Sequence, residues 1–142
     1  MSGAVEAPPR AERLRPEVIE ANLALDKAFC AGMSGKDLDA AMACLWNSPD
    51  LVVVLYGKVL RGWEQARNEV RAMFETMRAL TLEINEVNYV AAGDGVIAVG
   101  TATYHFYPRV GAPTMLVERW TDLRRCIEGR WYYVLDHAEE VK

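Results

Sequence analysis

Apolar residues recur every three or four positions in three parts of the chain, which is the spacing of one buried helical face. These segments are residues 16–31, 36–46 and 63–79. The first begins with Pro16, a residue that suits the first position of a helix, and carries Leu25 and Phe29 on its apolar face. The pattern therefore predicts three helices in the N-terminal half.

The second kind of pattern is a set of runs rich in β-branched and alternating apolar residues, separated by glycine turns. The predicted strands are residues 51–56, 59–61, 80–92, 96–107, 114–125 and 130–138. Helices that precede a run of consecutive strands favour an α+β fold, with an antiparallel sheet packed on one face by the helices.

Length and composition narrow the class of protein. The 142 residues fit one domain, and we expect a flexible leader at residues 1–15 followed by one domain over residues 16–142. The leader lacks the apolar core of a signal peptide. The net charge of −4 argues against a nucleic-acid partner, and no apolar run is long enough for a membrane helix.

Candidate cofactor and metal motifs are weak. Cys30, Cys44 and Cys126 are widely spaced and form no CxxC pair, which argues against a metal site and fits a reducing cytoplasm. Gly93 and Gly95 match a dinucleotide-binding spacing, but strand residues follow them where that motif requires a helix. We therefore expect no cofactor, no metal and a cytoplasmic location.

Two local motifs carry a resemblance to a known family. One is VLRGWEQAR at residues 59–67, and the other runs from RWTDL at residues 119–123 through GRW at 129–131 to DH at 136–137. With the order of elements, they make the chain similar to the SnoaL-like group of the nuclear transport factor 2-like superfamily, which has a cystatin-like cone fold. The resemblance implies three N-terminal helices on a curved, mostly antiparallel sheet that forms a cone around an internal, largely apolar pocket.

The resemblance also suggests which side chains face that pocket. It places Thr101, Asp122 and Ala138 at pocket-facing positions, and alternation along the strands then adds further residues. The predicted catalytic group is His105, Asp122 and Asp136, and the predicted pocket residues are Phe29, Trp46, Tyr56, Trp63, Thr101, Thr103, Trp120 and Tyr132. A histidine beside a carboxylate can exchange protons near neutral pH, although the same groups can also be purely structural.

The same register turns Trp131, Tyr133 and Leu135 to the opposite face of the sheet, with His137 at its edge. Large apolar groups on an exposed face are typical of an interface, so we predict a homodimer through this face.

Two functions remain open at this stage. The first is a cofactor-free enzyme that isomerises, cyclises or dehydrates a small, largely apolar substrate by acid–base chemistry. The alternative is a non-catalytic ligand-binding or association module. The superfamily that the chain resembles includes both kinds of protein, so its fold does not decide between them.

Overall fold

The helices of the computed structural model, which describes residues 13–142, begin and end near the predicted positions. They are α1 (Pro16–Ser34), α2 (Leu38–Met42) and α3 (Trp63–Thr76). Pro16 opens α1, and the Asp37 side chain caps α2 by accepting a hydrogen bond of 3.1 Å from the Ala40 amide. Gly62 precedes α3 with a φ of 85°, a conformation that favours glycine.

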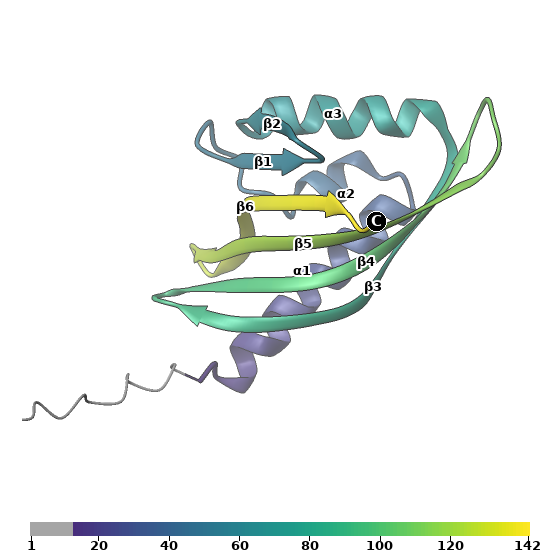
Figure 1. Ribbon diagram of the computed structural model, residues 1–142. Coiled ribbons are helices and arrows are strands. Elements are labelled where there is room, and N and C mark those ends of the chain that lie inside the picture. Colours follow the sequence, from purple (N-terminus) through teal and green to yellow (C-terminus); the bar gives the residue numbers. More distant parts are fainter. Residues whose placement is uncertain (1–12) are drawn as a thin grey trace, which may run out of the picture.

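The strands form one mixed sheet. They are β1 (Val52–Leu55), β2 (Lys58–Arg61), β3 (Met77–Ala92), β4 (Gly95–Pro108), β5 (Thr114–Ile127) and β6 (Arg130–Glu140). The order across the sheet is β2-β1-β6-β5-β4-β3, with β1 and β6 parallel and every other pair antiparallel. Figure 1 shows a curved, unclosed sheet with α1 and α2 behind it and α3 beside the β1–β2 end. The α+β prediction is confirmed.

Two irregularities in strand pairing decide which side chains face the helices. The β3–β4 register shifts between Ile84 and Glu86, and the β5–β6 register shifts between Leu123 and Arg124. Such irregularities increase the local twist of a sheet and change the alternation of its faces. In β6 the extra residue is Val134, so Tyr133 and Asp136 both point toward the helices although they are three positions apart.

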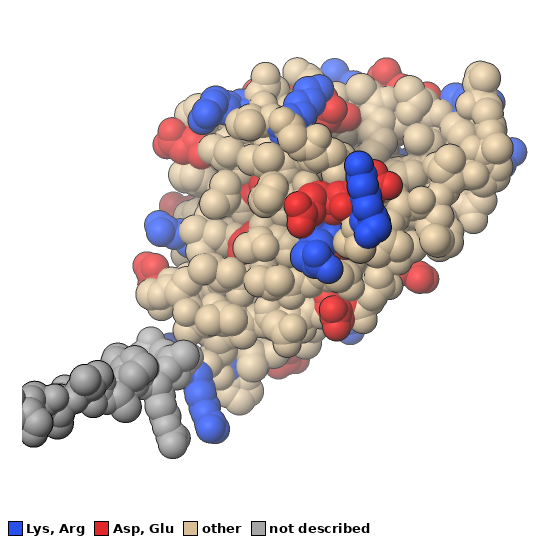
Figure 2. Space-filling model, viewed as in Figure 1, with Lys and Arg blue, Asp and Glu red and all other residues tan. Residues whose placement is uncertain are grey.

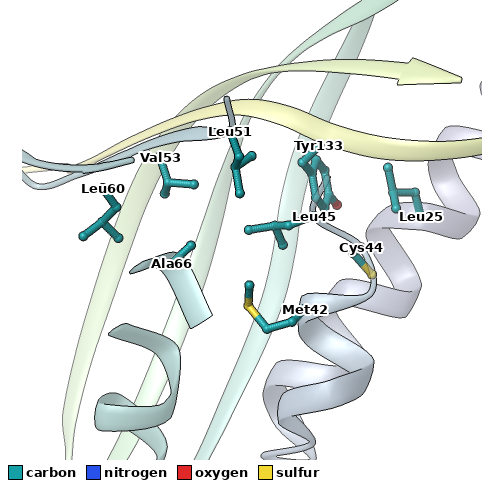
Figure 3. Close-up of a cluster of buried hydrophobic side chains, with 9 residues drawn as sticks. All are labelled: Leu25, Met42, Cys44, Leu45, Leu51, Val53, Leu60, Ala66 and Tyr133. Carbon is teal, nitrogen blue, oxygen red and sulfur yellow. The ribbon is translucent and has the colours of Figure 1, made fainter. Parts of the chain in front are cut away.

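The apolar core lies between the helices and the concave face of the sheet. One cluster, drawn in Figure 3, joins all three helical regions to β1, β2 and β6. It consists of Leu25, Met42, Cys44, Leu45, Leu51, Val53, Leu60, Ala66 and Tyr133. A second cluster packs the end of α1 and α3 against β3 and β4 around Met33, Phe74 and Leu80. The two clusters leave room between them for a cavity.

Two sequence predictions need comment here. The second helix is shorter than predicted, because residues 44–46 leave the helix and pair with β6 instead. The Trp46 amide donates to the Tyr133 carbonyl oxygen at 2.9 Å, and Leu45 forms a bridge with the same residue. The predicted leader falls almost entirely on residues 1–12, which lie outside the described residues. From residue 13 onward, no helix has the length and apolar character needed to cross a membrane.

Candidate functional site

A cavity of about 140 Å³ lies between α1, α3 and the concave face of the sheet. Its walls are mostly apolar, and they come from residues far apart in the sequence, such as Phe29, Val70 and Phe106. Tyr56, which is 49% exposed, also lines it and therefore marks its mouth. An apolar enclosure with a few polar groups is the usual form of a small-molecule site.

Alternation along β5 directs a row of polar side chains toward the helices. Glu118, Trp120 and Asp122 line the cavity, and Arg124 lies next in the row behind it. All four are buried. Residues two apart on a strand share a face, so this row follows from the sequence once a single member has been placed.

Asp136 of β6 is the least satisfied polar group in the cavity. Its Oδ1 atom is fully buried and has no hydrogen-bond partner among the described residues. It lies directly across from Asp122 in the β5–β6 pairing. Burial raises the pKa of Asp136 well above its ordinary value, and the nearby Asp122 and Glu118 carboxyls raise it further. These effects favour the protonated form of Asp136 over the ionised form.

Asp122 is held quite differently from Asp136. Arg124, which is fully buried, donates to Asp122 from Nε at 2.7 Å and from Nη2 at 3.1 Å, and the Trp120 indole N–H adds a bond of 2.9 Å. Burial raises the pKa of the Asp122 carboxyl, and the bonds from Arg124 and Trp120 oppose that rise. The Asp122 and Asp136 carboxyls thus have unlike environments. Such a difference moves the pKa values of two neighbouring carboxyls apart, so that one can act as an acid while the other stays ionised.

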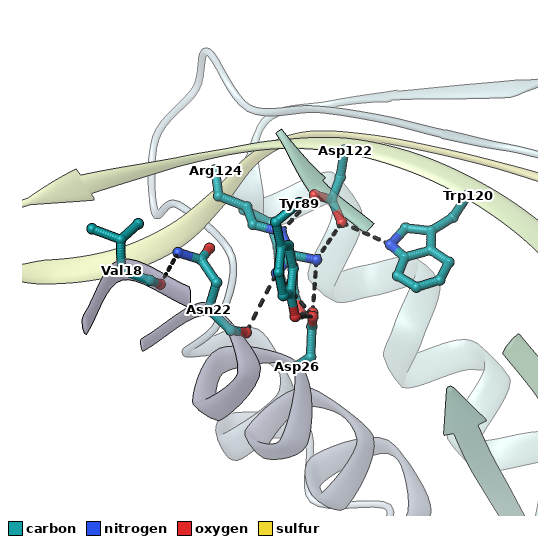
Figure 4. Close-up of polar contacts among 8 residues, drawn as sticks. Val18, Asn22, Asp26, Tyr89, Trp120, Asp122 and Arg124 are labelled. Carbon is teal, nitrogen blue, oxygen red and sulfur yellow. Dashed lines mark hydrogen bonds and ion pairs between the residues drawn. The ribbon is translucent and has the colours of Figure 1, made fainter. Parts of the chain in front are cut away.

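Arg124 also binds a second carboxylate, on α1. Its Nη2 and Nη1 atoms lie 2.8 and 2.9 Å from the two Asp26 oxygens. The hydroxyls of Tyr133, at 2.5 Å, and of Tyr89 donate to Asp26 as well. Figure 4 shows how this network joins α1 to β3 and β5. The charged groups of Arg124, Asp26 and Asp122 are paired with one another, whereas the Oδ1 atom of the adjoining Asn22 is buried without a hydrogen-bond partner.

Near the mouth, Glu118 forms a second polar position. Its Oε2 atom accepts a hydrogen bond of 2.5 Å from the Tyr56 hydroxyl. Burial raises the pKa of Glu118, and the bond from Tyr56 opposes this. Tyr56 reaches Glu118 from the β1–β2 turn, where its φ of 52° is in the left-handed region.

The charges around the cavity are unbalanced. Asp26, Glu118, Asp122 and Asp136 all line it, and within residues 13–142 the one guanidinium or ammonium group bonded to any of them is that of Arg124. A single buried cation cannot neutralise four buried carboxylates, which is consistent with the raised pKa of Asp136. By contrast, the surface in Figure 2 has acidic and basic side chains interspersed.

Trp120 forms one wall of the cavity and depends on a glycine of β4. A Cβ atom at Gly100 would lie 2.0 Å from the Trp120 ring and 2.4 Å from the Glu86 carbonyl oxygen. Neither distance is possible for real atoms, so residue 100 has to be glycine while the indole lies flat across β4. This placement lets the indole N–H reach Asp122.

The structure brings together some of the residues predicted from the sequence. Phe29, Tyr56, Trp120, Asp122 and Asp136 all line the cavity. Trp63 does not, because it packs against the first core cluster and donates from Nε1 to the Met42 carbonyl oxygen at 3.0 Å.

His105 is placed elsewhere, and so are Thr101 and Thr103. All three lie on β4, where the prediction assigned the inward-facing positions wrongly by one residue. Tyr104 and Phe106 line the cavity, and the odd-numbered residues of β4 face away from it. The Thr103 hydroxyl instead contacts Asn85 at 2.9 Å on the outer face.

Two predicted aromatic residues also lie outside the cavity. Tyr132 contacts the Arg130 guanidinium, 5.5 Å from its ring centre. Trp46 borders a separate groove on the outside of the sheet, together with Leu135. Neither side chain lines the cavity.

The predicted dimer face is also corrected. Tyr133 is buried and bonded to Asp26, and Trp131 packs against the first core cluster, whereas Leu135 is 43% exposed on the other side of the sheet. The irregularity at Val134 separates them. The three residues therefore do not form one face, and self-association stays a prediction.

Sequence reasoning missed Asp26, Glu118, Arg124 and Tyr133. Asp26 had a signal, because Asn22 and Asp26 are polar residues one turn apart on the apolar face of α1. Glu118 and Arg124 share the strand face of Asp122, but charged residues are rarely fully buried and were not expected there. Across the described residues, no group of three or more His, Cys, Asp or Glu side chains could hold a metal ion.

The architecture is that of the cystatin-like α+β proteins with a curved, open sheet. Residues 27–134 match the SnoaL-like domain, and the chain belongs to this family. The predicted resemblance is confirmed. No curated protein matches the sequence at a significant level.

Several solved structures share the fold. A nuclear transport factor 2-like superfamily protein from Salmonella enterica superposes with a TM-score of 0.82 and 16% identity, over 90% of this chain and 94% of the other. A candidate dehydratase of that family from Streptomyces avermitilis gives 0.79 and 16%, over 90% and 99%. A candidate aromatic ring hydroxylase from Novosphingobium aromaticivorans gives 0.84 and 16%, over 92% and 93%. At these identities, the likeness concerns the fold.

Proposed function

We propose that the protein binds a small, largely apolar molecule in its cavity and transforms it by cofactor-free acid–base chemistry, with Asp136 as the proton donor. The observation that carries this proposal is the buried Asp136 carboxyl, which has an unpartnered Oδ1 atom in an otherwise mostly apolar cavity. A buried polar atom without a partner lowers the stability of the fold, and a hydrogen bond to a bound ligand would supply the missing partner.

A dehydration can be written with this residue alone. The Asp136 proton passes to the hydroxyl of the substrate, and the C–O bond breaks so that its electron pair leaves with water. The Asp136 carboxylate then removes a proton from the neighbouring carbon, and the electrons of that C–H bond form the C=C bond. The carboxyl is restored, and no oxidant or reductant is needed.

The surrounding residues support each half of this cycle. In the resting state, burial and the Asp122 and Glu118 carboxyls favour the protonated form of Asp136. After proton transfer, the positive charge of Arg124 stabilises the Asp136 carboxylate, because it lowers the pKa of that group. The apolar walls exclude water, which strengthens these electrostatic effects.

The comparisons favour the same class of reaction without specifying the substrate. One similar structure is described as a candidate dehydratase. The alternative is a ligand-binding module without turnover. It is favoured by the Asp26–Arg124–Asp122 network, whose carboxylates are already occupied by Arg124.

The proposal is tested by infrared spectroscopy and by turnover. The wild-type protein should show the band of a protonated, buried carboxyl at pH 7, and Asp136→Asn should remove it. Monocyclic β-hydroxyketones incubated in D₂O and followed by proton NMR should lose water or exchange their α-protons. General acid catalysis contributes about 10²–10⁴-fold, so Asp136→Asn should slow these reactions by at least 100-fold.

His105→Ala is the matched control, because His105 faces away from the cavity. Its rate should equal that of the wild type. Absence of the carboxyl band would contradict the assignment of Asp136. A protein that shows the band and binds the ketones, but neither dehydrates nor exchanges them, would be a binding module.

A further inference from the structure

The cavity has two polar positions rather than one. Asp136 is the first, and the Glu118 carboxyl, held by Tyr56, is the second. The Tyr56 hydroxyl occupies Oε2 of Glu118, and no donor among the described residues reaches Oε1. Each position can thus form one more hydrogen bond, and the two bonds are of opposite kinds: protonated Asp136 donates, whereas Glu118 accepts.

The strand register sets the separation of the two positions. Glu118 is four residues from Asp122, and Asp136 lies directly across from Asp122. At about 3.3 Å per residue, the backbone positions of Glu118 and Asp136 are about 13 Å apart along the sheet. The concave curvature and the side chains, which both enter the cavity, bring the two carboxyls closer than this. With a hydrogen bond of about 2.8 Å at each end, the ligand between them is at most about as long as one six-membered ring with substituents at opposite ends.

The size of the cavity is consistent with such a ring. Its volume is about 140 Å³, and an apolar cavity of about 150 Å³ accommodates benzene in another protein. Ala102, Tyr104 and Trp120, which line the cavity, give the middle of the ligand mostly apolar contacts.

The charge of the cavity restricts the ligand further. Among the described residues, no Lys, Arg or His side chain lines the cavity, because Arg124 lies behind it and is fully engaged with Asp26 and Asp122. A carboxylate or phosphate on the ligand would therefore face buried acidic groups without a cation to pair with.

We propose that the ligand is an uncharged monocyclic compound with a carbonyl or ether oxygen at the Asp136 end and a hydroxyl at the Glu118 end. This inference rests on the proposed function, since it uses Asp136 as a donor. It adds the second position, the length of the ligand and the exclusion of anions.

Three cyclohexane probes test it by calorimetric titration at pH 7. They are cyclohexanone, 4-hydroxycyclohexanone and 4-oxocyclohexanecarboxylate, which differ in having no group, a hydroxyl or an anion at the far end. A hydrogen bond to a buried carboxyl should make the hydroxyl probe bind about tenfold more tightly than cyclohexanone. The anionic probe should bind at least tenfold more weakly than cyclohexanone.

Two variants separate this inference from the proposed function. Glu118→Leu should abolish the advantage of the hydroxyl probe without weakening cyclohexanone, and Glu118→Gln should restore it, because the amide oxygen still accepts. Asp136→Val should weaken both uncharged probes, whereas Asp136→Asn, which keeps an N–H donor, should retain them.

Equal affinities for the three probes, no binding of either uncharged probe, or a hydroxyl advantage that survives Glu118→Leu would overturn the inference alone. The infrared and turnover measurements on Asp136 would stand in each of these cases. Unchanged affinity for cyclohexanone in Asp136→Val would instead count against the proposed function.

Discussion

Replacing Asp136 by valine should make the protein more stable while removing its chemistry. Asp136 lies in β6 between β1 and β5, where a β-branched residue suits the strand. Its Oδ1 atom is buried without a partner, and the adjacent cavity of about 140 Å³ has space for the valine methyl groups. Removing a buried, unsatisfied polar group should recover about 1–3 kcal/mol of unfolding free energy. For a domain of this size, this corresponds to a Tm higher by about 4–12 °C.

The gain should depend on pH in a defined direction. Burial raises the pKa of Asp136 in the folded state, whereas the unfolded chain has an aspartate pKa of about 3.9. Below that value both states are protonated and the group makes no pH-dependent contribution. As pH rises from about 4 toward the raised pKa of the folded state, the unfolded state loses its proton first, and the wild-type protein loses stability. The valine variant lacks this loss, so its advantage should widen with pH.

Thermal and urea unfolding between pH 4 and 8.5 measure both effects. Glu139→Val is the matched control, because Glu139 is exposed on the same strand, and it should change the unfolding free energy by no more than about 0.5 kcal/mol. An Asp136→Val protein that is less stable than the wild type, or an advantage that shrinks as pH rises, would refute the reasoning. Either result would mean that Asp136 is a satisfied structural carboxyl.

Three further predictions follow from other parts of the molecule. Arg124→Met should lower the urea-unfolding free energy by about 3–5 kcal/mol, because it leaves the buried Asp26 and Asp122 carboxylates without a positively charged partner. Arg125→Met, at an exposed position, should be nearly neutral. Ellman's reagent at pH 8 should modify exposed Cys126 quickly and Cys30 slowly, since burial raises the Cys30 pKa to about 11; equal rates would contradict this. Light scattering at micromolar concentration should report a dimer that Leu135→Glu, on the outer face, disrupts; a monomeric wild-type protein would end that prediction.

Sequence patterns located the elements of this fold well, because helices and strands are set by local periodicity and turn residues. They failed to tell which residues of a strand face the cavity and which face away from it. The inner positions of β4 include Gly100 and Ala102, and the outer positions include Val99 and Thr101, so apolar alternation does not tell the two faces apart. Nor could the pattern locate the extra residue in β6, since a shift in strand register depends on the neighbouring strand.

The candidate site was only partly predictable for a related reason. Asp122 and Asp136 were found because the family resemblance fixed the phase of β5 and β6 near them. Arg124 was missed because a fully buried arginine is stable only with its partners, and one of them, Asp26, is 98 residues away on α1. Such a contact depends on the tertiary fold and leaves little trace in either segment alone.

The contact between Gly100 and Trp120 has a consequence for how the cavity could change over generations. Any side chain at position 100 collides with the indole ring while the tryptophan is present. The Glu86 carbonyl oxygen, 2.4 Å from the same Cβ position, would still exclude a side chain after the loss of Trp120. A lineage that replaces the indole therefore gains space for new ligands but no freedom at position 100. Directed evolution of a larger pocket would therefore start at Trp120 and keep glycine at position 100.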